Sequence, residues 1–480
     1  MAESLKQKTV KGTIWSAVEA FSTQGIQFLV TLVMARILTP ADFGIVGMIT
    51  VFIAISNVFI NSGFTSALIR KPDRTEADNS TVFYFNIVVA FILYIILFFC
   101  APLIADFYDQ PILTLVTRII SLSFVIGSFN VVQRAQYNIK LDFKTQAKGS
   151  LIGVFLSGFI GILMAYLGYG VWALVAQQLS NLVFTSIFLW IYSSWRPQLI
   201  YSWKSFRDMF SFGSRMLISS ILDTVYTNVY SLVIGKVYKA SDLGYYNRAQ
   251  SFTSISSSNI TGVIQRVTFP VLASIQNEDE RLREGYRRIL RISGFIIFPL
   301  MLMLAALSKP LIITLLTEKW MYSSLLLVPI CFSSMWYPIH AINLNLLQVK
   351  GRSDLFLRLE IIKKVMGVSI LIGTVPLGLY WMCWGSVLSA LIGLIINTHY
   401  TGKLLNLGFL KQMKDLTPVL ILSLIMGSGV WFTIKYLPLT EPVLLIIGII
   451  EGALIYLAGA KLFQFPEFTE IRYLLKRNKQ

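Results

Sequence analysis

Charged side chains within long apolar stretches are the feature of this sequence that most directly points to chemistry. Arg215 and Asp223 lie on one helical face of such a stretch, and Glu19 lies in another. The planar fork of an arginine suits pairs of phosphate oxygens, and a carboxylate in an apolar setting can bind and release a cation. We expect Arg215 to bind an anion, and Glu19 and Asp223 to be ion-coupling candidates. A structural Arg215–Asp223 pair and a structural Glu19 carboxyl are the alternatives.

Other ionisable residues also lie in apolar stretches. Arg118 and Arg248 are further anion-binding candidates, and for Arg248 the alternative is a side chain that extends to interfacial water, as an arginine near the end of a stretch can do. His340 shares a helical face with Ser333 and Tyr337. It is a candidate proton relay, and a hydrogen-bonded packing residue is the more common role for such a histidine.

Polar residues also recur at helical spacing in four of the stretches. They are Ser16, Glu19, Thr23 and Gln27; Thr50, Asn57 and Asn61; Arg215, Ser219, Asp223 and Thr227; and Gln250, Ser254, Ser258, Thr261 and Gln265. Because polar groups are costly in lipid, these stripes predict a water-accessible cavity shared by the four segments. Helix packing through hydroxyl groups is the alternative.

The elements that position these residues are fourteen apolar stretches of about twenty residues each. With a rise of 1.5 Å per residue, a helix of that length crosses a hydrocarbon core about 30 Å thick, and backbone groups in lipid must be satisfied within the segment. We therefore predict an all-α polytopic membrane protein with fourteen transmembrane helices. Their approximate ranges are 12–35, 43–69, 81–104, 112–133, 149–167, 170–192, 208–235, 245–274, 290–308, 320–349, 356–376, 380–400, 415–437 and 442–461.

The basic residues orient these helices. Most of the 41 lysines and arginines fall in every second connecting segment, or in the N- and C-terminal segments. The opposite loops carry only Arg36, Lys236, Lys239, Lys309, Lys319 and Lys435. This positive-inside pattern predicts that both termini lie in the cytoplasm.

Composition excludes several classes of protein. A mean hydropathy of +0.68, with 55% hydrophobic and 14% charged residues, excludes an ordinary soluble globular protein. The net charge of +17 collects in short segments facing the cytoplasm, so anionic lipid headgroups explain it better than nucleic acid. Cys100, Cys331 and Cys383 lack a paired spacing, so we expect neither a disulfide nor a metal site. Connecting segments are too short for a soluble catalytic domain, and we expect no cofactor.

The two halves of the sequence resemble each other. Residues 35–44 correspond to 235–244, Pro102 to Pro310, Gln136 to Gln348, and Gly168 to Gly378. Four matches in order, at slowly drifting offsets, predict an internal repeat of six helices in parallel orientation. We place an N-terminal lobe at 12–200, a C-terminal lobe at 205–402, and two extra helices at 415–461.

Several segments also resemble a known family, over about residues 10–400. They are 11–16, 68–71, 168–174, 348–354 and the turn Ala35-Arg36-Ile37-Leu38-Thr39-Pro40-Ala41-Asp42-Phe43-Gly44. These are similar to the Wzx-type polysaccharide flippases of the multidrug/oligosaccharidyl-lipid/polysaccharide (MOP) superfamily, most of all to colanic-acid and teichuronic-acid exporters.

The resemblance implies a V-shaped pair of lobes around a central cavity in a bacterial inner-membrane flippase. Its substrate would be an undecaprenyl-pyrophosphate-linked oligosaccharide. Its other partners would be membrane lipids and a coupling ion, H⁺ or Na⁺. Arg215, Arg118 and Arg248 would then bind the pyrophosphate, and Asn57, Asn61, Ser254 and Ser258 the sugars. Glu19, Asp223 and His340 would couple transport to an ion.

Two other functions compete with this one. A cation-coupled small-molecule or drug antiporter of the same superfamily would favour a carboxylate-dominated cavity and twelve helices. A membrane enzyme of glycan synthesis would need clustered carboxylates for a divalent metal or a large outer loop. The acidic cluster Glu278, Asp279 and Glu280 lies in a short basic segment, so we do not expect an enzyme.

Overall fold

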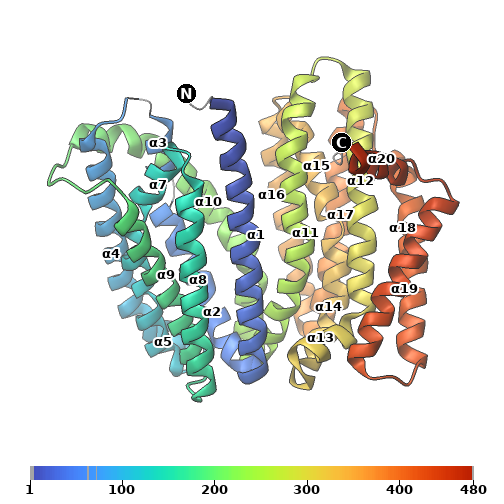
Figure 1. Cartoon of the computed structure of the whole chain (residues 1–480), viewed down its shortest axis with the longest axis horizontal. Helices are drawn as coiled ribbons and strands as arrows, with labels where there is room; N and C mark the ends of the chain where they lie inside the picture. Colours follow the sequence, from blue (N-terminus) through green and yellow to red (C-terminus); the bar gives the residue numbers. More distant parts are fainter. Residues whose placement is uncertain (1–4, 62–63, 72, 478–480) are drawn as a thin grey trace. The chain divides into compact units, whose positions relative to one another are not determined.

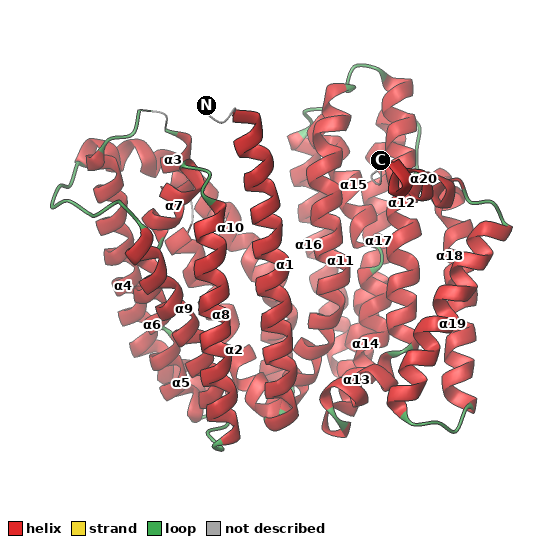
Figure 2. Ribbon diagram, in the orientation of Figure 1, coloured by secondary structure: helices red, strands yellow, loops and turns green. Residues whose placement is uncertain are grey.

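The computed structural model describes residues 5–61, 64–71 and 73–477, and within these ranges every regular element is a helix (Figure 2). The helices up to residue 244 are α1 (Leu5–Ile37), α2 (Pro40–Asn61), α3 (Phe64–Arg70), α4 (Glu76–Tyr108), α5 (Ile112–Ile120), α6 (Leu122–Ser128), α7 (Val131–Ile139), α8 (Phe143–Tyr166), α9 (Val171–Tyr192) and α10 (Trp203–Val237). Then follow α11 (Ala240–Ser274), α12 (Asp279–Ala306), α13 (Ser308–Leu316), η1 (Glu318–Trp320), α14 (Met321–Ser334), α15 (Tyr337–Val349), α16 (Ser353–Thr374), η2 (Val375–Leu377), α17 (Leu379–Leu405), α18 (Phe409–Tyr436), α19 (Glu441–Leu462) and α20 (Pro466–Arg477) (Figure 1).

Eleven candidate membrane spans occur among the described residues, which makes the chain a polytopic helical membrane protein. They are 18–37, 40–60, 76–108, 112–139, 143–166, 171–192, 279–306, 318–349, 379–405, 409–436 and 441–462. The other three predicted spans correspond to α10, α11 and α16, which have 35, 35 and 22 residues. They are long enough to cross a bilayer, but they are not among the eleven spans found in the described residues. The count of fourteen stays a prediction.

Two predicted spans are not continuous helices, contrary to the sequence-based expectation. The 112–133 stretch is divided into α5, α6 and α7, and 320–349 is divided at Met335–Trp336 into α14 and α15. At the first site, Ser121 and Ser128 donate to backbone carbonyls three residues earlier, a local bond that competes with the helical pattern. At the second site, Pro338 has no N–H to donate and lies in the first turn of α15.

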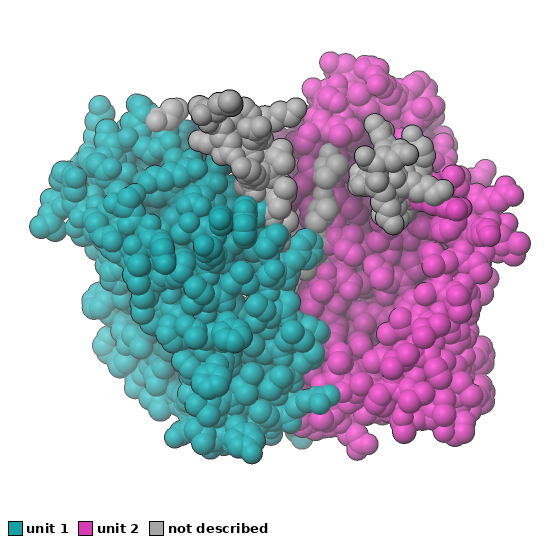
Figure 3. All heavy atoms as spheres, in the orientation of Figure 1, with its two compact units in different colours: residues 1–244 teal, residues 245–480 magenta. Residues whose placement is uncertain are grey.

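The contacts divide the chain into two compact units, residues 1–244 and 245–480 (Figure 3). In the first unit, α8 packs on α1 and α9, and α10 packs on α2, α3 and α4. In the second, α12 packs on α18, and α17 on α14 and α16. The first unit thus includes α10, the seventh predicted span. The lobe ranges 12–200, 205–402 and 415–461 stay predictions, because this division does not test the repeat.

Local geometry recurs at the positions that the repeat relates. The backbone N–H of Thr39 donates to the Asp42 carboxylate at 2.9 Å, and that of Lys239 donates to the Asp242 carboxylate at 3.1 Å. Gly168 and Gly378 have φ angles of +83° and +98°, a conformation that favours glycine. The two divided spans also correspond to each other in the repeat.

Candidate functional site: a polar cavity in the first unit

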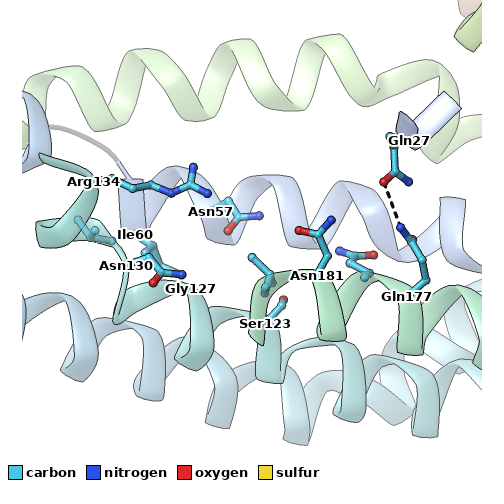
Figure 4. Close-up of a pocket in the computed structure, with 12 residues that line it drawn as sticks. Gln27, Asn57, Ile60, Ser123, Gly127, Asn130, Arg134, Gln177 and Asn181 are labelled. Carbon is cyan, nitrogen blue, oxygen red and sulfur yellow. Dashed lines mark hydrogen bonds between the residues drawn. The ribbon is translucent and has the colours of Figure 1, made fainter. Parts of the chain in front are cut away.

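A polar cavity of about 450 Å³ lies within the first unit (Figure 4). It is lined from α1, α2, α6, α7 and α9 and from the α6–α7 connection. The lining residues are Gln27, Asn57, Ile60, Ser123, Gly127, Asn130, Val131, Arg134, Gln177, Gln178, Asn181 and Leu182. Amides predominate among the polar lining residues, and none of the twelve is acidic. Neutral amides both donate and accept hydrogen bonds, so this lining suits a ligand rich in hydroxyl groups.

Direct hydrogen bonds fix part of the lining. Gln177 on α9 donates from Nε2 to Gln27 Oε1 on α1 at 3.1 Å (Figure 4). Close packing of α8 between these two helices supports the arrangement. A Cβ on Gly161 would lie 2.7 Å from Gln177 Cβ, and one on Gly158 would lie 2.5 Å from Val30 Cγ2. The small residues of α8 thus let its neighbours approach closely.

The break between α6 and α7 supplies polar atoms to the cavity. Asn130 precedes α7, and its Nδ2 donates to Ser186 Oγ at 2.5 Å. Its Oδ1 and the Ser123 hydroxyl are buried without a hydrogen-bond partner in the described protein. A buried polar atom without a partner costs about 1–3 kcal/mol, so a ligand that supplies the missing bonds gains that energy.

Arg134 provides a positive charge in the cavity wall. Its side chain is exposed, and Figure 4 shows the guanidinium extending from α7 toward Asn57. It forms no ion pair or side-chain hydrogen bond with any described residue. Glu19 on α1 interacts with it electrostatically, while Glu19 Oε1 accepts a hydrogen bond from Ser150 Oγ at 2.7 Å. The cavity thus combines an arginine that has no hydrogen-bond partner among the described residues with a lining of amides.

The structure brings only some of the predicted residues to this cavity. Asn57 lines it, and Glu19 lies close enough to act on Arg134. Arg118 is not among the lining residues: its Nε donates to the Phe98 carbonyl at 3.2 Å, and its guanidinium lies 4.4 Å from the Phe98 ring centroid.

Three more of the predicted residues lie in the second unit. Arg248 is 7% exposed and lies over the Trp320 ring at 5.7 Å. The Ser254 hydroxyl donates to the Ser251 carbonyl at 3.0 Å. His340 Nδ1 lies 3.0 Å from Asn397 Nδ2, and the residue is half-buried within that unit. The binding roles of Arg248 and Ser254 and the coupling role of His340 stay predictions.

The remaining predicted residues lie on α2, α10 and α11. Asp223 on α10 is exposed, and its carbonyl accepts a hydrogen bond from Thr227. The side chains of Arg215, Asn61 and Ser258 lie outside the described part of the chain. The Arg215–Asp223 pair and the predicted cavity between the lobes are therefore untested. The cavity described above is internal to the first unit.

Two features of this cavity were not predicted from the sequence. They are the contribution of the sixth predicted span, 170–192, and that of Arg134. Gln177 and Asn181 recur at a spacing of four in an otherwise apolar stretch, which is the same signal that identified the other stripes. The predicted stretch 112–133 ends one residue before Arg134, and this boundary places Arg134 in a connecting segment. The helix α7 continues to Ile139, and so the side chain belongs to the cavity wall.

Comparison with known proteins identifies the family. The family model described as "Polysaccharide biosynthesis protein" matches residues 33–325. Among curated relatives, the chain is 25% identical to the teichuronic acid biosynthesis protein TuaB of Bacillus subtilis, over 95% of both chains. It is 27% identical to the lipopolysaccharide biosynthesis protein WzxC of Escherichia coli, over 82% of this chain and 81% of that protein.

Solved structures share the fold. The lipid II flippase MurJ in an inward closed conformation aligns with a TM-score of 0.77 and 16% identity, over 94% of this chain and 98% of that one. An inward-facing multidrug resistance MATE family transporter of the MOP superfamily aligns with a TM-score of 0.63 and 18% identity. The alignment covers 84% of this chain and 98% of that transporter. The family resemblance inferred from the sequence motifs is confirmed: the chain belongs to the polysaccharide biosynthesis protein family, whose fold is that of the MOP superfamily.

Proposed function

We propose that this protein moves undecaprenyl-pyrophosphate-linked oligosaccharides across the bacterial inner membrane by alternating access. The observation that carries the proposal is the Arg134 guanidinium, which pairs with no described residue, beside an amide-lined cavity. The names of its relatives, which refer to the biosynthesis of surface polysaccharides, agree with it. The structural likeness to a lipid II flippase supports the fold that such transport requires.

The cavity fits both polar parts of this substrate. A pyrophosphate carries about two negative charges, and moving it into a poorly solvated cavity without partners costs many kcal/mol. Arg134 can donate two parallel hydrogen bonds to its oxygens. The amides of Gln178, Asn181 and Asn57 supply donors and acceptors for sugar hydroxyls. The nearby Glu19 carboxylate partly offsets the charge of Arg134.

The proposal includes fourteen spans with cytoplasmic N- and C-termini. The eleven apolar spans provide most of them, and α10, α11 and α16 would supply the other three. The recurring Thr39/Asp42 and Lys239/Asp242 bonds support two six-helix repeats, followed by the extra helices α18 and α19. In this topology Arg134 lies toward the cytoplasmic side, where a lipid-linked substrate is made available.

The residues predicted from the sequence keep their roles within this proposal. Arg215, Arg118 and Arg248 would meet the pyrophosphate at other stages of the cycle, and Asn61, Ser254 and Ser258 would contact sugars. Glu19, Asp223 and His340 are the groups proposed to couple transport to H⁺ or Na⁺. Of these, Glu19 interacts electrostatically with Arg134, so a cation bound at its carboxylate would change the charge beside Arg134.

The drug antiporter is the alternative function. It favours a cavity in which carboxylates attract a cation, whereas the lining of this cavity contains an arginine, amides and a hydroxyl but no carboxylate. An arginine in the wall repels a cationic drug. The electrostatics of this cavity therefore favour an anionic substrate.

Transport in proteoliposomes tests the proposal. A fluorescent lipid-linked oligosaccharide placed in one leaflet should become accessible to a glycosidase on the other side only when the protein is present. Loss of a charge-assisted hydrogen bond costs about 1.5–3 kcal/mol, so Arg134→Ala should slow transport at least tenfold. Arg134→Lys should retain part of the rate.

Lys148→Ala is the matched control, because Lys148 is an exposed cation of α8 that does not line the cavity. It should leave the rate unchanged. Equal rates for Arg134→Ala and Lys148→Ala would refute the role of Arg134. Wild-type protein that moves a cationic dye but no lipid-linked sugar would favour the antiporter.

A further inference from the structure

A second pocket, of about 480 Å³, lies within the second unit, away from the polar cavity. Its apolar wall is formed by one face of α18 and by the connection that leads into α20. The main wall residues are Pro418, Ile421, Ile425, Phe463 and Phe465. Ile421 and Ile425 are 51% and 55% exposed, so this wall is open to an apolar occupant.

Charged residues gather at one end of this pocket. Arg291 on α12 forms an ion pair with Glu467 on α20 at 3.1 Å, and Arg287 Nε donates to Asp415 on α18 at 2.7 Å. Each of these two arginines is thus matched by a carboxylate. Lys414 on α18 also lines the pocket, and it forms no ion pair or side-chain hydrogen bond with any described residue. Among the described residues, the charged end of the pocket thus retains one cation without a carboxylate partner.

The pocket is held together by contacts between three helices. Besides the Arg291–Glu467 pair, Arg288 on α12 donates from Nε to Glu470 on α20 at 2.7 Å. These two pairs join the short helix α20 to α12, and the Arg287–Asp415 pair joins α12 to α18. The pocket therefore has a defined wall and a defined charged end, and an occupant would contact all three helices.

The dimensions fit a single hydrocarbon chain. From Lys414 to Ile425 the helix rises about 16 Å at 1.5 Å per residue. The volume of 480 Å³ is roughly sixteen times the ~30 Å³ that a water molecule occupies in the liquid, and a methylene group is of similar size. A single acyl chain of a phospholipid has about this many methylene groups, whereas an undecaprenyl chain is several times larger.

The charged end lies on the side of the membrane where anionic lipids act on proteins. In the proposed topology the segment before α18 is cytoplasmic, so Lys414 lies at the level of the inner-leaflet headgroups. Basic residues there attract anionic lipids, and basic pockets between membrane helices bind their headgroups. The apolar wall continues from this level toward the membrane interior.

We propose that this pocket is a binding site for an anionic phospholipid of the inner leaflet. One acyl chain lies along Pro418, Ile421 and Ile425, and the phosphate meets Lys414. The bound lipid joins α12, α18 and α20, and so stabilises the C-terminal part of the second unit. The site is distinct from that of the transported oligosaccharide, and its occupancy does not depend on the proposed transport.

Native mass spectrometry of the full-length protein with added phosphatidylglycerol tests the proposal. Phosphatidylglycerol should be retained in preference to zwitterionic phosphatidylcholine of the same chain length. One basic residue near an anionic headgroup contributes about 1 kcal/mol, so Lys414→Ala should weaken retention about fivefold. Lys411→Ala is the matched control: it lies one turn earlier, is exposed, and bonds to Asn406 instead of lining the pocket.

A second variant tests the apolar wall. Ile421 is half exposed, so Ile421→Trp should fill the pocket and reduce retention without changing the melting temperature of lipid-free protein. Equal retention of the two lipids, or equal retention by Lys414→Ala and Lys411→Ala, would overturn the proposal. Displacement of phosphatidylglycerol by an equal amount of undecaprenyl phosphate would also overturn it, by assigning the pocket to the substrate chain. Because no oligosaccharide is present, these outcomes are independent of those of the transport assay.

Discussion

Two glycines at the starts of α2 and α11 create a close backbone contact that can be tested directly. A Cβ added to Gly44 would lie 1.7 Å from the carbonyl oxygen of Ala240 and 2.5 Å from its carbonyl carbon. A Cβ added to Gly244 would lie 1.9 Å from the carbonyl oxygen of Pro40. All four residues belong to the first unit. Since the clashing atoms are backbone, no side chain can move aside, and the two turns must separate.

Two opposing effects determine the result of Gly44→Ala. An alanine within a helix is more stable than a glycine by about 0.5–1 kcal/mol. Restoring a normal contact of about 3.5 Å requires the turns to move apart by roughly 1.8 Å, and overpacking of this kind typically costs 1–3 kcal/mol or more. We expect the clash to dominate, with a net loss of about 2 kcal/mol in the free energy of unfolding. For a unit of this size that corresponds to a fall of about 4–8 °C in melting temperature.

Thermal unfolding of the detergent-solubilised protein, followed by tryptophan fluorescence, measures this effect. Gly25→Ala on α1 and Gly262→Ala on α11 are matched controls, because nothing lies within 4 Å of a Cβ at either position. The controls should melt at or slightly above the wild-type temperature, whereas Gly44→Ala and Gly244→Ala should melt below it. If Gly44→Ala melted as high as Gly25→Ala, the close contact between these turns would be refuted.

The other predictions concern topology, the Arg215–Asp223 stripe and the connection before α4. Cysteines replacing Lys71 and Arg283 should react with an impermeant thiol reagent only from the cytoplasm. Cysteines replacing Lys239 and Lys319 should react only from outside. Labelling of Arg283→Cys from outside would contradict the prediction of fourteen spans. Arg215→Ala should abolish transport without loss of protein, and recovery of transport in Arg215→Ala/Asp223→Ala would show a structural ion pair instead. Lys71 Nζ donates to the buried Asp78 carboxylate at 2.9 Å, a bond that raises the pKa of Lys71 above its ordinary value of 10.5. The stabilisation from this bond is therefore complete below pH 10.5 and is lost as pH rises through the higher pKa of the folded state. Lys71→Met should lower the melting temperature at about pH 7. The same substitution should make a smaller difference in strongly alkaline buffer.

The sequence by itself determined the class of this protein and most of its helices. A run of about twenty apolar residues must satisfy its backbone hydrogen bonds internally in lipid, so length and hydropathy predict a helix without reference to the rest of the chain. All eleven apolar spans of the structure had been predicted in this way. The Ala35–Gly44 turn was informative for the same reason: the Thr39–Asp42 bond that starts α2 is local.

Only the tertiary structure decided where the polar cavity lies. Gln27 and Gln177 are 150 residues apart, and their hydrogen bond depends on α8 packing closely against α1 and α9. Arg134 lies in the cavity wall because the stretch after residue 111 is divided. As a result, α7 begins at Val131 and extends past the apolar residues. The packing of α10 on α2, α3 and α4 likewise depends on contacts between distant segments. Helical periodicity assigns each residue to a face of its own helix, but which face meets which neighbour depends on the shapes of all the helices packed together.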